Sequence, residues 1–322
     1  MHTFVLTRIV DATSDEILRF SQVQKHFAYM GEGLSIRCRP LTVCYDGEVL
    51  SYLYTIKVDA LKFLRTENTS SQQFRVIIRL LDQLLGYGNF SVDDMTVSRV
   101  DYCYNIRIED EDTRLILFDL LQKCPTRAIY TVRDVKYKTS IYSRSKSKTV
   151  NVYDKNTERS VKFFVSGNSK NLAKNYERDI VRMELQIKKG HLKYMAKQGV
   201  ARSAKNWINA ETERHYLQKM YGMFPKGDFY ALDAAEHIVS YSNLTKTTKR
   251  HLIDFLREIA QNDMDTAKRK ICYNTYRRYL NILADLGVNP ITIPRDCGLS
   301  YIQSPFAFPE PQTDGLATIV RA

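Results

Sequence analysis

Hydrophobic and polar residues alternate with a period of two in several stretches of the first 190 residues, as they do in half-buried β-strands. A turn is expected at Asp46-Gly47, between the first two of these strands. Residues 1–66 are predicted to consist of strands and turns, and 129–165 to form a hairpin or meander. The clearest predicted strands are 34–39, 52–61, 97–108 and 180–188.

Two segments within this region follow the helical period instead, at 71–85 and 112–123. Beyond about residue 190 the helical period dominates, and the tail from Pro290 is rich in proline and expected to be loosely attached. Strands with interspersed helices indicate an α+β fold, an antiparallel sheet with helices on one face, followed by a helical region. The predicted C-terminal helical segments are 193–221, 232–240, 247–260 and 265–286. The predicted domains are 1–190, 191–289 and a flexible tail at 290–322.

The period of two separates the polar side chains of these strands onto one face. Each predicted strand then has an apolar face for helices and a polar face free for chemistry. The residues assigned to polar faces are Asp59, Arg99, Asp101, Cys103, Asn105, Asn151, Tyr153, Lys155, Arg182, Glu184, Gln186 and Lys188.

The net charge is +12, and residues 136–188 hold 13 Lys or Arg against 5 Asp or Glu, a local charge of +8. A basic patch of this kind favours a polyanionic partner over a merely basic protein. The 21 tyrosines and 14 phenylalanines offer surfaces on which unpaired bases stack. The six cysteines form no Cys-x-x-Cys pair, and no apolar run reaches the roughly 20 residues of a membrane span. We therefore expect a protein of the reducing cytoplasm.

Candidate chemistry comes from acids and one tyrosine. Asp59, Asp101 and Glu184 are predicted to converge on one divalent cation, and oxygen ligands favour Mg²⁺ or Mn²⁺. The alternative for each acid is a solvated surface position. Tyr153 is a candidate nucleophile, because Lys155 on the same face can stabilise its phenolate. The run 143–148, with Arg144, Lys146 and Lys148, is either a solvated turn or a phosphate-binding loop. The histidines are scattered, and zinc-hydrolase, Walker A and Gly-x-Ser-x-Gly motifs are absent.

The sequence motifs around these candidate residues, taken in order, resemble those of rolling-circle replication initiators of filamentous phages and related plasmids. The family shows Arg-x-Asp, then Tyr-x-Lys-x-x-Glu, then Arg-x-Glu. The corresponding residues here are Arg99 and Asp101, then Tyr153, Lys155 and Glu158, then Arg182 and Glu184. Short motifs similar to those of the family are also present at 58–64, 275–279 and 286–289. Asn105 departs from the family, whose members often carry a second acid there, and the His-hydrophobe-His pair of related nickases is absent.

The resemblance implies a nickase-like fold and a protein that cuts one strand at a replication origin. It implies that Tyr153 attacks DNA to form a 5′-phosphotyrosine link, later religated, while Asp101, Glu184 and Asp59 bind the metal. The cations Arg99, Lys155 and Arg182 are candidates to neutralise the transition-state charge. Duplex origin DNA is expected to bind the C-terminal helices through residues that include Lys268, Arg269, Arg277 and Arg278. Single- and double-stranded DNA, host polymerase and host helicase are the implied partners.

Two other interpretations stay open. An initiator that binds origin repeats and recruits host proteins without cutting explains the charge and the helices, but not the acids on the strands. A tyrosine recombinase requires an Arg and His cluster ahead of a C-terminal tyrosine, which is a pattern this sequence lacks.

Overall fold

The computed structural model describes residues 2–125, 132–134, 138–169, 172–306 and 317–318. Contacts divide the chain into two compact units that interleave along the sequence. Unit 1 comprises 1–104, 146–149 and 184–217, and unit 2 comprises 105–145, 150–183 and 218–322. The predicted domain boundaries at 190 and 289 stay predictions.

Unit 1 is built on strands β1 (Thr3–Asp11), β2 (Leu34–Val43) and β3 (Val49–Asp59), with parts of β4 (Thr96–Arg107) and β8 (Ile180–Ile187). Their order is β2-β3-β1-β4-β8. The registers of β2 with β3, β3 with β1 and β1 with β4 are all antiparallel. The turn at Asp46-Gly47 is confirmed, since Val43 pairs with Val49 and Gly47 has a φ of +89°.

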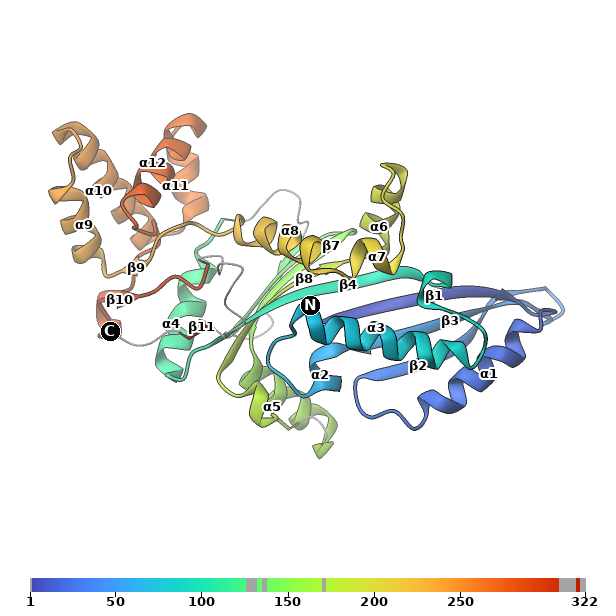
Figure 1. Cartoon of the computed structure of the whole chain (residues 1–322). Coiled ribbons are helices and arrows are strands. Elements are labelled where there is room, and N and C mark those ends of the chain that lie inside the picture. Colours follow the sequence, from blue (N-terminus) through green and yellow to red (C-terminus); the bar gives the residue numbers. More distant parts are fainter. Residues whose placement is uncertain (1, 126–131, 135–137, 170–171, 307–316, 319–322) are drawn as a thin grey trace. The chain divides into compact units, whose positions relative to one another are not determined.

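Helices α1 (Glu16–Phe27) and α3 (Ser71–Gly86) lie on one side of these strands (Figure 1). The Phe20 ring stacks on Tyr54 of β3 at 4.0 Å and on Phe90 at 4.3 Å. Helix α3 is confirmed, and Ser70 and Gln73 form its capping box. The prediction of only strands and turns in 1–66 was wrong, because α1 and the short α2 (Ala60–Leu64) lie there.

The predicted helical stretch at 193–221 consists of three helices. These are α6 (Lys189–Lys197), α7 (Ala204–Trp207) and α8 (Ala210–Tyr221). Tyr102 of β4 ties this segment to the sheet, since its hydroxyl donates to the Trp207 carbonyl at 2.7 Å. The Tyr102 ring stacks on Tyr216 at 5.6 Å.

The strands of unit 2 follow the order β4-β8-β7-β6-β5, with β7 at Lys148–Asp154, β6 at Ser140–Arg144 and β5 at Val132–Asp134. Strand β11 (Ala317–Thr318) pairs parallel with β4. Helix α4 (Glu111–Gln122) is as predicted. The hairpin or meander predicted over 129–165 ends at Asp154, because helix α5 (Lys155–Ser166) begins at the next residue. Residues 129–131 and 135–137 lie outside the described residues.

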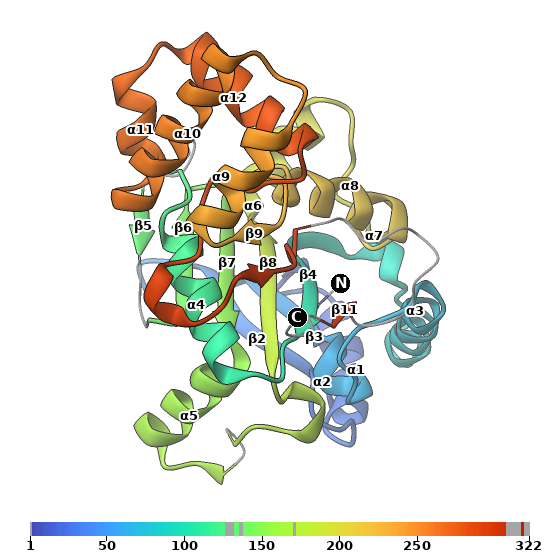
Figure 2. The same cartoon turned by 90° about the vertical axis from the view of Figure 1, so that its left-hand side faces the viewer.

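The C-terminal helices α9 (Leu232–Tyr241), α10 (Lys246–Gln261), α11 (Met264–Lys270) and α12 (Tyr273–Asp285) belong to unit 2 (Figure 2). The predicted helix 265–286 is two helices, because the backbone is extended at Ile271 and Cys272. The apolar face predicted for α10 is confirmed by the burial of Leu252, Phe255, Leu256 and Ile259.

The first part of the predicted flexible tail is packed. Ile291 and Ile293 are buried, and strand β10 (Tyr301–Ile302) pairs with β9 (Phe229–Tyr230). Residues 307–316 and 319–322 lie outside the described residues. Short 3₁₀ helices occupy Val92–Asp94, Asn175–Glu177 and Arg295–Cys297. The predicted fold class, an α+β protein with an antiparallel sheet and a C-terminal helical region, is confirmed.

Candidate active site

The polar strand residues singled out in the sequence are mostly buried. The Asp101 side chain is 1% exposed and that of Glu184 is 7% exposed. The expectation of a polar face free for chemistry is therefore wrong at these positions, because both faces of β4 and β8 are packed there. A buried carboxylate is stable only with hydrogen-bond partners, cations or a proton, so its neighbours indicate its role.

In unit 1, His2, Asp101 and Glu184 each present one ligand atom, and the three atoms lie within 4.8 Å of one another. We call these three residues the acid–histidine cluster. His2 Nδ1 lies 3.1 Å from Glu184 Oε2, and His2 Nε2 lies 3.4 Å from Asp59 Oδ1. Asp59 therefore adjoins the cluster through the imidazole, while its carboxylate also caps α2 by accepting from the Lys62 amide.

The strand register explains this convergence. Thr3 at the start of β1 pairs with Asp59 on one side and Asp101 on the other. The preceding residue, His2, is held by its own backbone, since its amide donates to the Asp101 carbonyl and its carbonyl accepts from Ala60. Strand β8 is the other neighbour of β4 and contributes Glu184.

Arg99 provides the cluster's cation. Its Nε donates to Asp101 Oδ1 at 2.8 Å, and its side chain is 40% exposed. Burial, together with the charge of Glu184, nevertheless raises the pKa of Asp101 to about 6, against the opposing effects of Arg99 and His2. The Asp101 carboxylate thus lacks enough positive charge to offset its burial.

This donor set fits a divalent cation. Two carboxylates on neighbouring strands, together with the imidazole of the residue before β1, are ligands that Mn²⁺ and similar ions accept, and the oxygens alone also suit Mg²⁺. A cation held between Asp101 and Glu184 would offset the burial, and the repulsion by Glu184, that raise the Asp101 pKa. Asp59 beside the imidazole is placed to orient it, as carboxylates do behind metal-binding histidines.

In unit 2, Lys155 begins α5 rather than ending a strand. Asp154 caps the helix by accepting from the Thr157 amide at 2.8 Å, which ends β7 one residue before Lys155. The Lys155 ammonium lies 2.6 Å from Glu158 and 3.3 Å from Glu177, and Arg159 pairs with Glu177 at 2.5 Å. We call Lys155, Glu158, Arg159 and Glu177 the lysine cluster.

The lysine cluster neutralises its own charges. Although burial pushes their pKa values upward, Lys155 and Lys162 lower the pKa of Glu158 to about 2, and Arg159 holds that of Glu177 below its usual value. Burial lowers the pKa of Lys155, with Arg182 acting in the same direction. Each carboxylate here has a cationic partner within hydrogen-bond distance.

The candidate nucleophile Tyr153 lies in β7 and is 7% exposed. The Lys155 ammonium lies 5.7 Å from the centre of its ring, although Lys155 begins helix α5 and does not share a strand face with Tyr153. Arg182, a predicted phosphate ligand, is buried and donates from Nε to Asn105 Oδ1 at 2.8 Å. Asn105, the position that departs from the resembled family, is therefore the partner of a strand arginine.

The remaining predicted phosphate-binding residues are spread over both units. Arg144 lies over the Tyr142 ring in unit 2, and Lys148 lies over the Tyr216 ring in unit 1. Lys146 is exposed. Lys268 and Arg269 on α11, and Arg277 and Arg278 on α12, are also exposed. All of these assignments, and those of Tyr153, Lys155 and the acids, stay predictions of function.

Sequence reasoning missed His2, Arg159 and Glu177. No local motif marks His2, because only the pairing of β1 with both β3 and β4 brings it to the acids. Helix α5 was detectable, since Asp154 followed three residues later by Thr157 and then Glu158 is a helix-start pattern.

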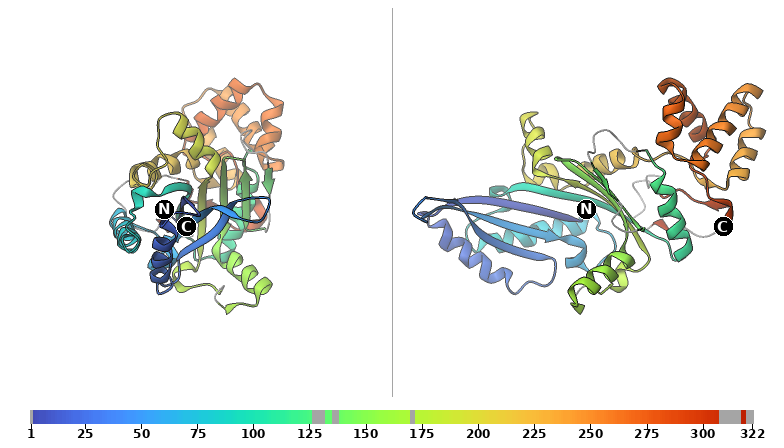
Figure 3. Two further views of the ribbon diagram at one scale, coloured as in Figure 1. Left: turned by 90° about the vertical axis from the view of Figure 1, so that its right-hand side faces the viewer. Right: turned by 180° about the vertical axis from the view of Figure 1, so that it is seen from behind.

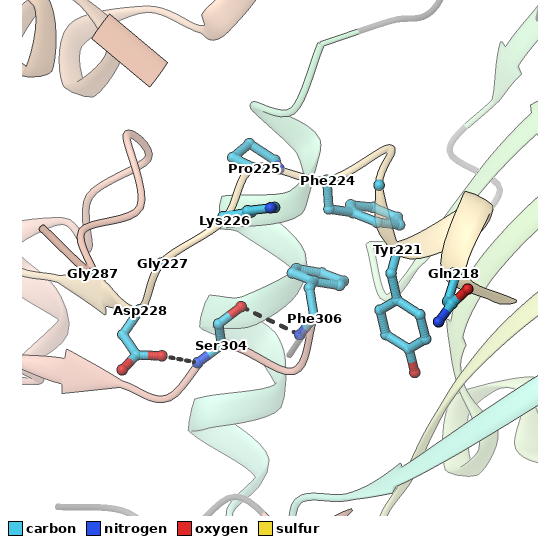
Figure 4. Close-up of a pocket in the computed structure, with 11 residues that line it drawn as sticks. Gln218, Tyr221, Phe224, Pro225, Lys226, Gly227, Asp228, Gly287, Ser304 and Phe306 are labelled. Carbon is cyan, nitrogen blue, oxygen red and sulfur yellow. Dashed lines mark hydrogen bonds between the residues drawn. The ribbon is translucent and has the colours of Figure 1, made fainter. Parts of the chain in front are cut away.

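A separate pocket of about 620 Å³ lies in unit 2 (Figure 4). Phe224 and Phe306 stack at 4.2 Å beside it, and Asp228 accepts from the Ser304 amide. It contains no predicted site residue, so it is distinct from the candidate chemistry. Its lining comprises Gln218, Tyr221, Gly222, Phe224, Pro225, Lys226, Gly227, Asp228, Gly287, Ser304 and Phe306.

One family model matches part of the chain. Residues 64–210 match a phage family model that describes the N-terminal region of a replication-associated protein. The matched range includes Asp101, Tyr153 and Glu184 but neither His2 nor Asp59. No curated protein matches the chain significantly. Among the described residues, no helix is both long and apolar enough to cross a bilayer.

Proposed function

We propose that this chain, whose residues 64–210 match a family model of phage replication-associated proteins, is a rolling-circle replication initiator that cuts one DNA strand at an origin by a tyrosine transesterification. The observation that carries the proposal is the acid–histidine cluster. It brings one ligand atom from each of His2, Asp101 and Glu184 within 4.8 Å of one another, and burial disfavours the Asp101 anion among them.

We propose Mg²⁺ or Mn²⁺ as the cofactor, held by His2, Asp101 and Glu184, with Asp59 orienting the imidazole. When bound, such an ion supplies Lewis-acid polarisation of a phosphate oxygen. Arg99, 40% exposed beside Asp101, is proposed to bind the same phosphate as its negative charge grows.

In the proposed reaction the Tyr153 phenol oxygen attacks phosphorus, and the bond from phosphorus to the 3′ oxygen breaks. The phenol proton passes to solvent or a base, and the leaving 3′ oxygen takes up a proton to become a free hydroxyl. The protein keeps the 5′ phosphate as a phosphotyrosine ester. Attack by a 3′ hydroxyl on that ester reverses the step and religates the strand. The free 3′ end would prime host polymerase, with a host helicase opening the duplex.

Lys155 is proposed to keep Tyr153 in place and to favour its phenolate. Its ammonium is 5.7 Å from the ring centre, and its position is secured by Glu158 and Glu177. Because the Lys155 ammonium is held by these two carboxylates, it is not free to bind a phosphate. Its proposed effect on Tyr153 is therefore electrostatic and positional.

The test is formation of a covalent protein–DNA adduct. Full-length protein is incubated with single-stranded origin DNA and Mn²⁺, and products are separated on a denaturing gel. We expect an adduct that requires the metal and disappears in Tyr153→Phe, which keeps the ring packing while removing the nucleophile. Tyr142→Phe, on the neighbouring strand β6, is the matched control and should react normally.

Two outcomes would overturn parts of the proposal. An adduct that persists in Tyr153→Phe but is lost in Tyr142→Phe would transfer the nucleophile to Tyr142. Origin binding without any cutting in Mg²⁺ or Mn²⁺ would instead support an initiator that recruits host replication proteins.

A further inference from the structure

Helices α1 and α3 cover one face of the unit 1 sheet. The side chains of the other face point away from that core. Directly paired residues on antiparallel strands point to the same side, so the register defines this face. Figure 3, in its right panel, shows the strands from this side, with α3 behind them. The face comprises Thr3, Val5, Thr7 and Ile9 of β1, Ser35, Arg37 and Arg39 of β2, Leu53, Thr55, Lys57 and Asp59 of β3, and Arg99 and Asp101 of β4.

The core side and this face differ sharply in burial. Phe4 and Leu6, which alternate with the face residues along β1, are 0% exposed. On the face itself, Ile9 is 61% exposed and Lys57 is also exposed. Burial thus alternates along β1 and β3, whereas β2 is exposed along most of its length, and the face is accessible at Ile9, Arg37, Arg39 and Lys57.

Four cations stand on this face in a connected row. Val5 pairs with Lys57 on one side and Arg99 on the other. Arg37 and Arg39 are exposed and follow two and four residues beyond Ser35, the partner of Lys57 on β2. We call Arg37, Arg39 and Lys57 the basic row, and Arg99 joins it to the acid–histidine cluster.

The basic row carries no acid of its own. No described carboxylate lies within ion-pair distance of Arg37, Arg39 or Lys57. On β1, the acid nearest the far end of the row is Asp11. Asp11 pairs with Ser51, which lies two residues along β3 from Leu53, the partner of Arg39. Unpaired cations arranged along strands favour a ligand with regularly spaced negative charges.

The row also has a direction. The register places Arg39 opposite Leu53. Leu53 lies six residues from Asp59 along β3, a distance of roughly 20 Å at the rise of a β-strand. At its other end the row passes Arg99 and reaches Asp101. A chain of phosphates lying on this row therefore runs directly to the cluster.

We propose that this face binds one unpaired DNA strand beside the scissile phosphate, with Arg37, Arg39 and Lys57 contacting its backbone. The inference rests on the proposed function for the identity of the strand. An unpaired strand fits better than a duplex, because Ile9 and Leu53 offer apolar contact to bases that a duplex would hide.

The test measures binding separately from cutting. Affinity for a single-stranded origin oligonucleotide is measured by fluorescence anisotropy at several salt concentrations, in EDTA so that no metal-dependent cutting occurs. The variant is R37Q/R39Q/K57Q. The matched control is R19Q/R75Q/R79Q, which removes three exposed cations from α1 and α3.

We expect the row variant to bind about 10- to 100-fold more weakly. The slope of log K against log[salt] should be less steep by about 2, because each of the three lost phosphate contacts to a single strand contributes about 0.7. The control should bind like the wild type.

Equal affinity and slope in the row variant and the control would overturn the inference. An equal loss toward duplex DNA of the same sequence would overturn the assignment to a single strand. If the wild type formed no adduct while the row variant alone lost strand binding, the cutting proposal would fail and the binding surface would stand.

Discussion

The acid–histidine cluster of unit 1 and the lysine cluster of unit 2 are both buried groups of charges, yet their electrostatics are opposite. In unit 1, burial and Glu184 raise the pKa of Asp101 to about 6, although Arg99 donates to it. In unit 2, despite burial, Lys155 and Lys162 lower the pKa of Glu158 to about 2. In unit 1 the Asp101 anion is therefore disfavoured, whereas in unit 2 the Glu158 anion is favoured.

The difference separates two uses of a buried carboxylate. Perturbed ionisation marks functional sites and structural ion-pair networks alike, so a shift alone does not distinguish them. Its direction is more informative here. An acid whose anion is disfavoured has capacity for a further cation, whereas an acid whose anion is favoured already has its partners.

The largest expected effect is on cutting. Asp101→Asn keeps the side-chain shape but removes a proposed metal ligand, so metal-dependent adduct formation should fall by about 10³-fold, equivalent to roughly 4 kcal/mol. Glu177→Gln makes the same chemical change in the lysine cluster and should reduce the rate by less than about tenfold. Gel assays under identical conditions measure both. Undiminished activity in Asp101→Asn and in Glu184→Gln would remove the metal site from unit 1.

The next effect concerns stability, and the order of the two variants reverses. Glu177→Gln leaves the buried Lys155 and Arg159 short of negative charge, which should lower the free energy of unfolding by about 3 kcal/mol. Asp101→Asn relieves an anion that burial disfavours, so without metal its effect should stay within about 1 kcal/mol. Urea unfolding in EDTA gives both values. Equal losses of stability would mean that the clusters do not differ in this way.

A smaller effect is the acid sensitivity of the lysine cluster. The pKa of Glu158 is about 2 in the folded protein against an ordinary 4.5, so the unfolded chain binds its proton first as the pH falls. The stabilisation from Glu158 is therefore complete above about pH 4.5 and is lost as the pH falls toward 2. It should amount to roughly 2 to 3 kcal/mol.

Comparison with Glu158→Gln isolates this contribution. The gap in unfolding free energy between wild type and variant should be widest above pH 4.5 and should close at lower pH. A gap that is constant from pH 2.5 to 6 would show that Glu158 is not held ionised by Lys155 and Lys162.

The smallest expected effect extends the contrast to the C-terminal helices. Arg277 and Arg278 on α12 have no described carboxylate within ion-pair distance, whereas Arg257 and Lys270 pair with Glu236 and Glu258. The double variant R277Q/R278Q should weaken duplex origin binding about tenfold and make the salt slope less steep by about 0.9 for each phosphate that its side chains no longer neutralise. The double variant R257Q/K270Q is the control. Identical behaviour of the two would assign α12 a structural role.

Local sequence determined much of the fold. The Asp-Gly turn at 46–47, the helix at 71–86 and the apolar face of α10 all follow from residues close together in the chain. Alternation along β4 and β8 also placed Asp101 and Glu184 on the same side of their strands as Arg99 and Arg182. These features depend on short-range periodicity, which a single sequence displays.

Some misses came from local signals that the strand pattern obscured. Phe20, Val23 and Phe27 have helical spacing within a region assigned to strands, and Asp154 begins a helix where Lys155 was placed in a strand. In both cases a plausible alternation competed with a helical pattern, and the packing of α1 and the cap of α5 decided the outcome.

Only the tertiary structure decided the composition of the site. His2 joins Asp101 and Glu184 because β1 lies between β3 and β4, a pairing between segments nearly one hundred residues apart. Likewise Glu177 reaches Lys155 from the 3₁₀ helix Asn175–Glu177, about twenty residues further along the chain. Period and propensity define which way a side chain points along its own strand. The neighbours that determine its charge state come from strand order, which depends on packing throughout the sheet.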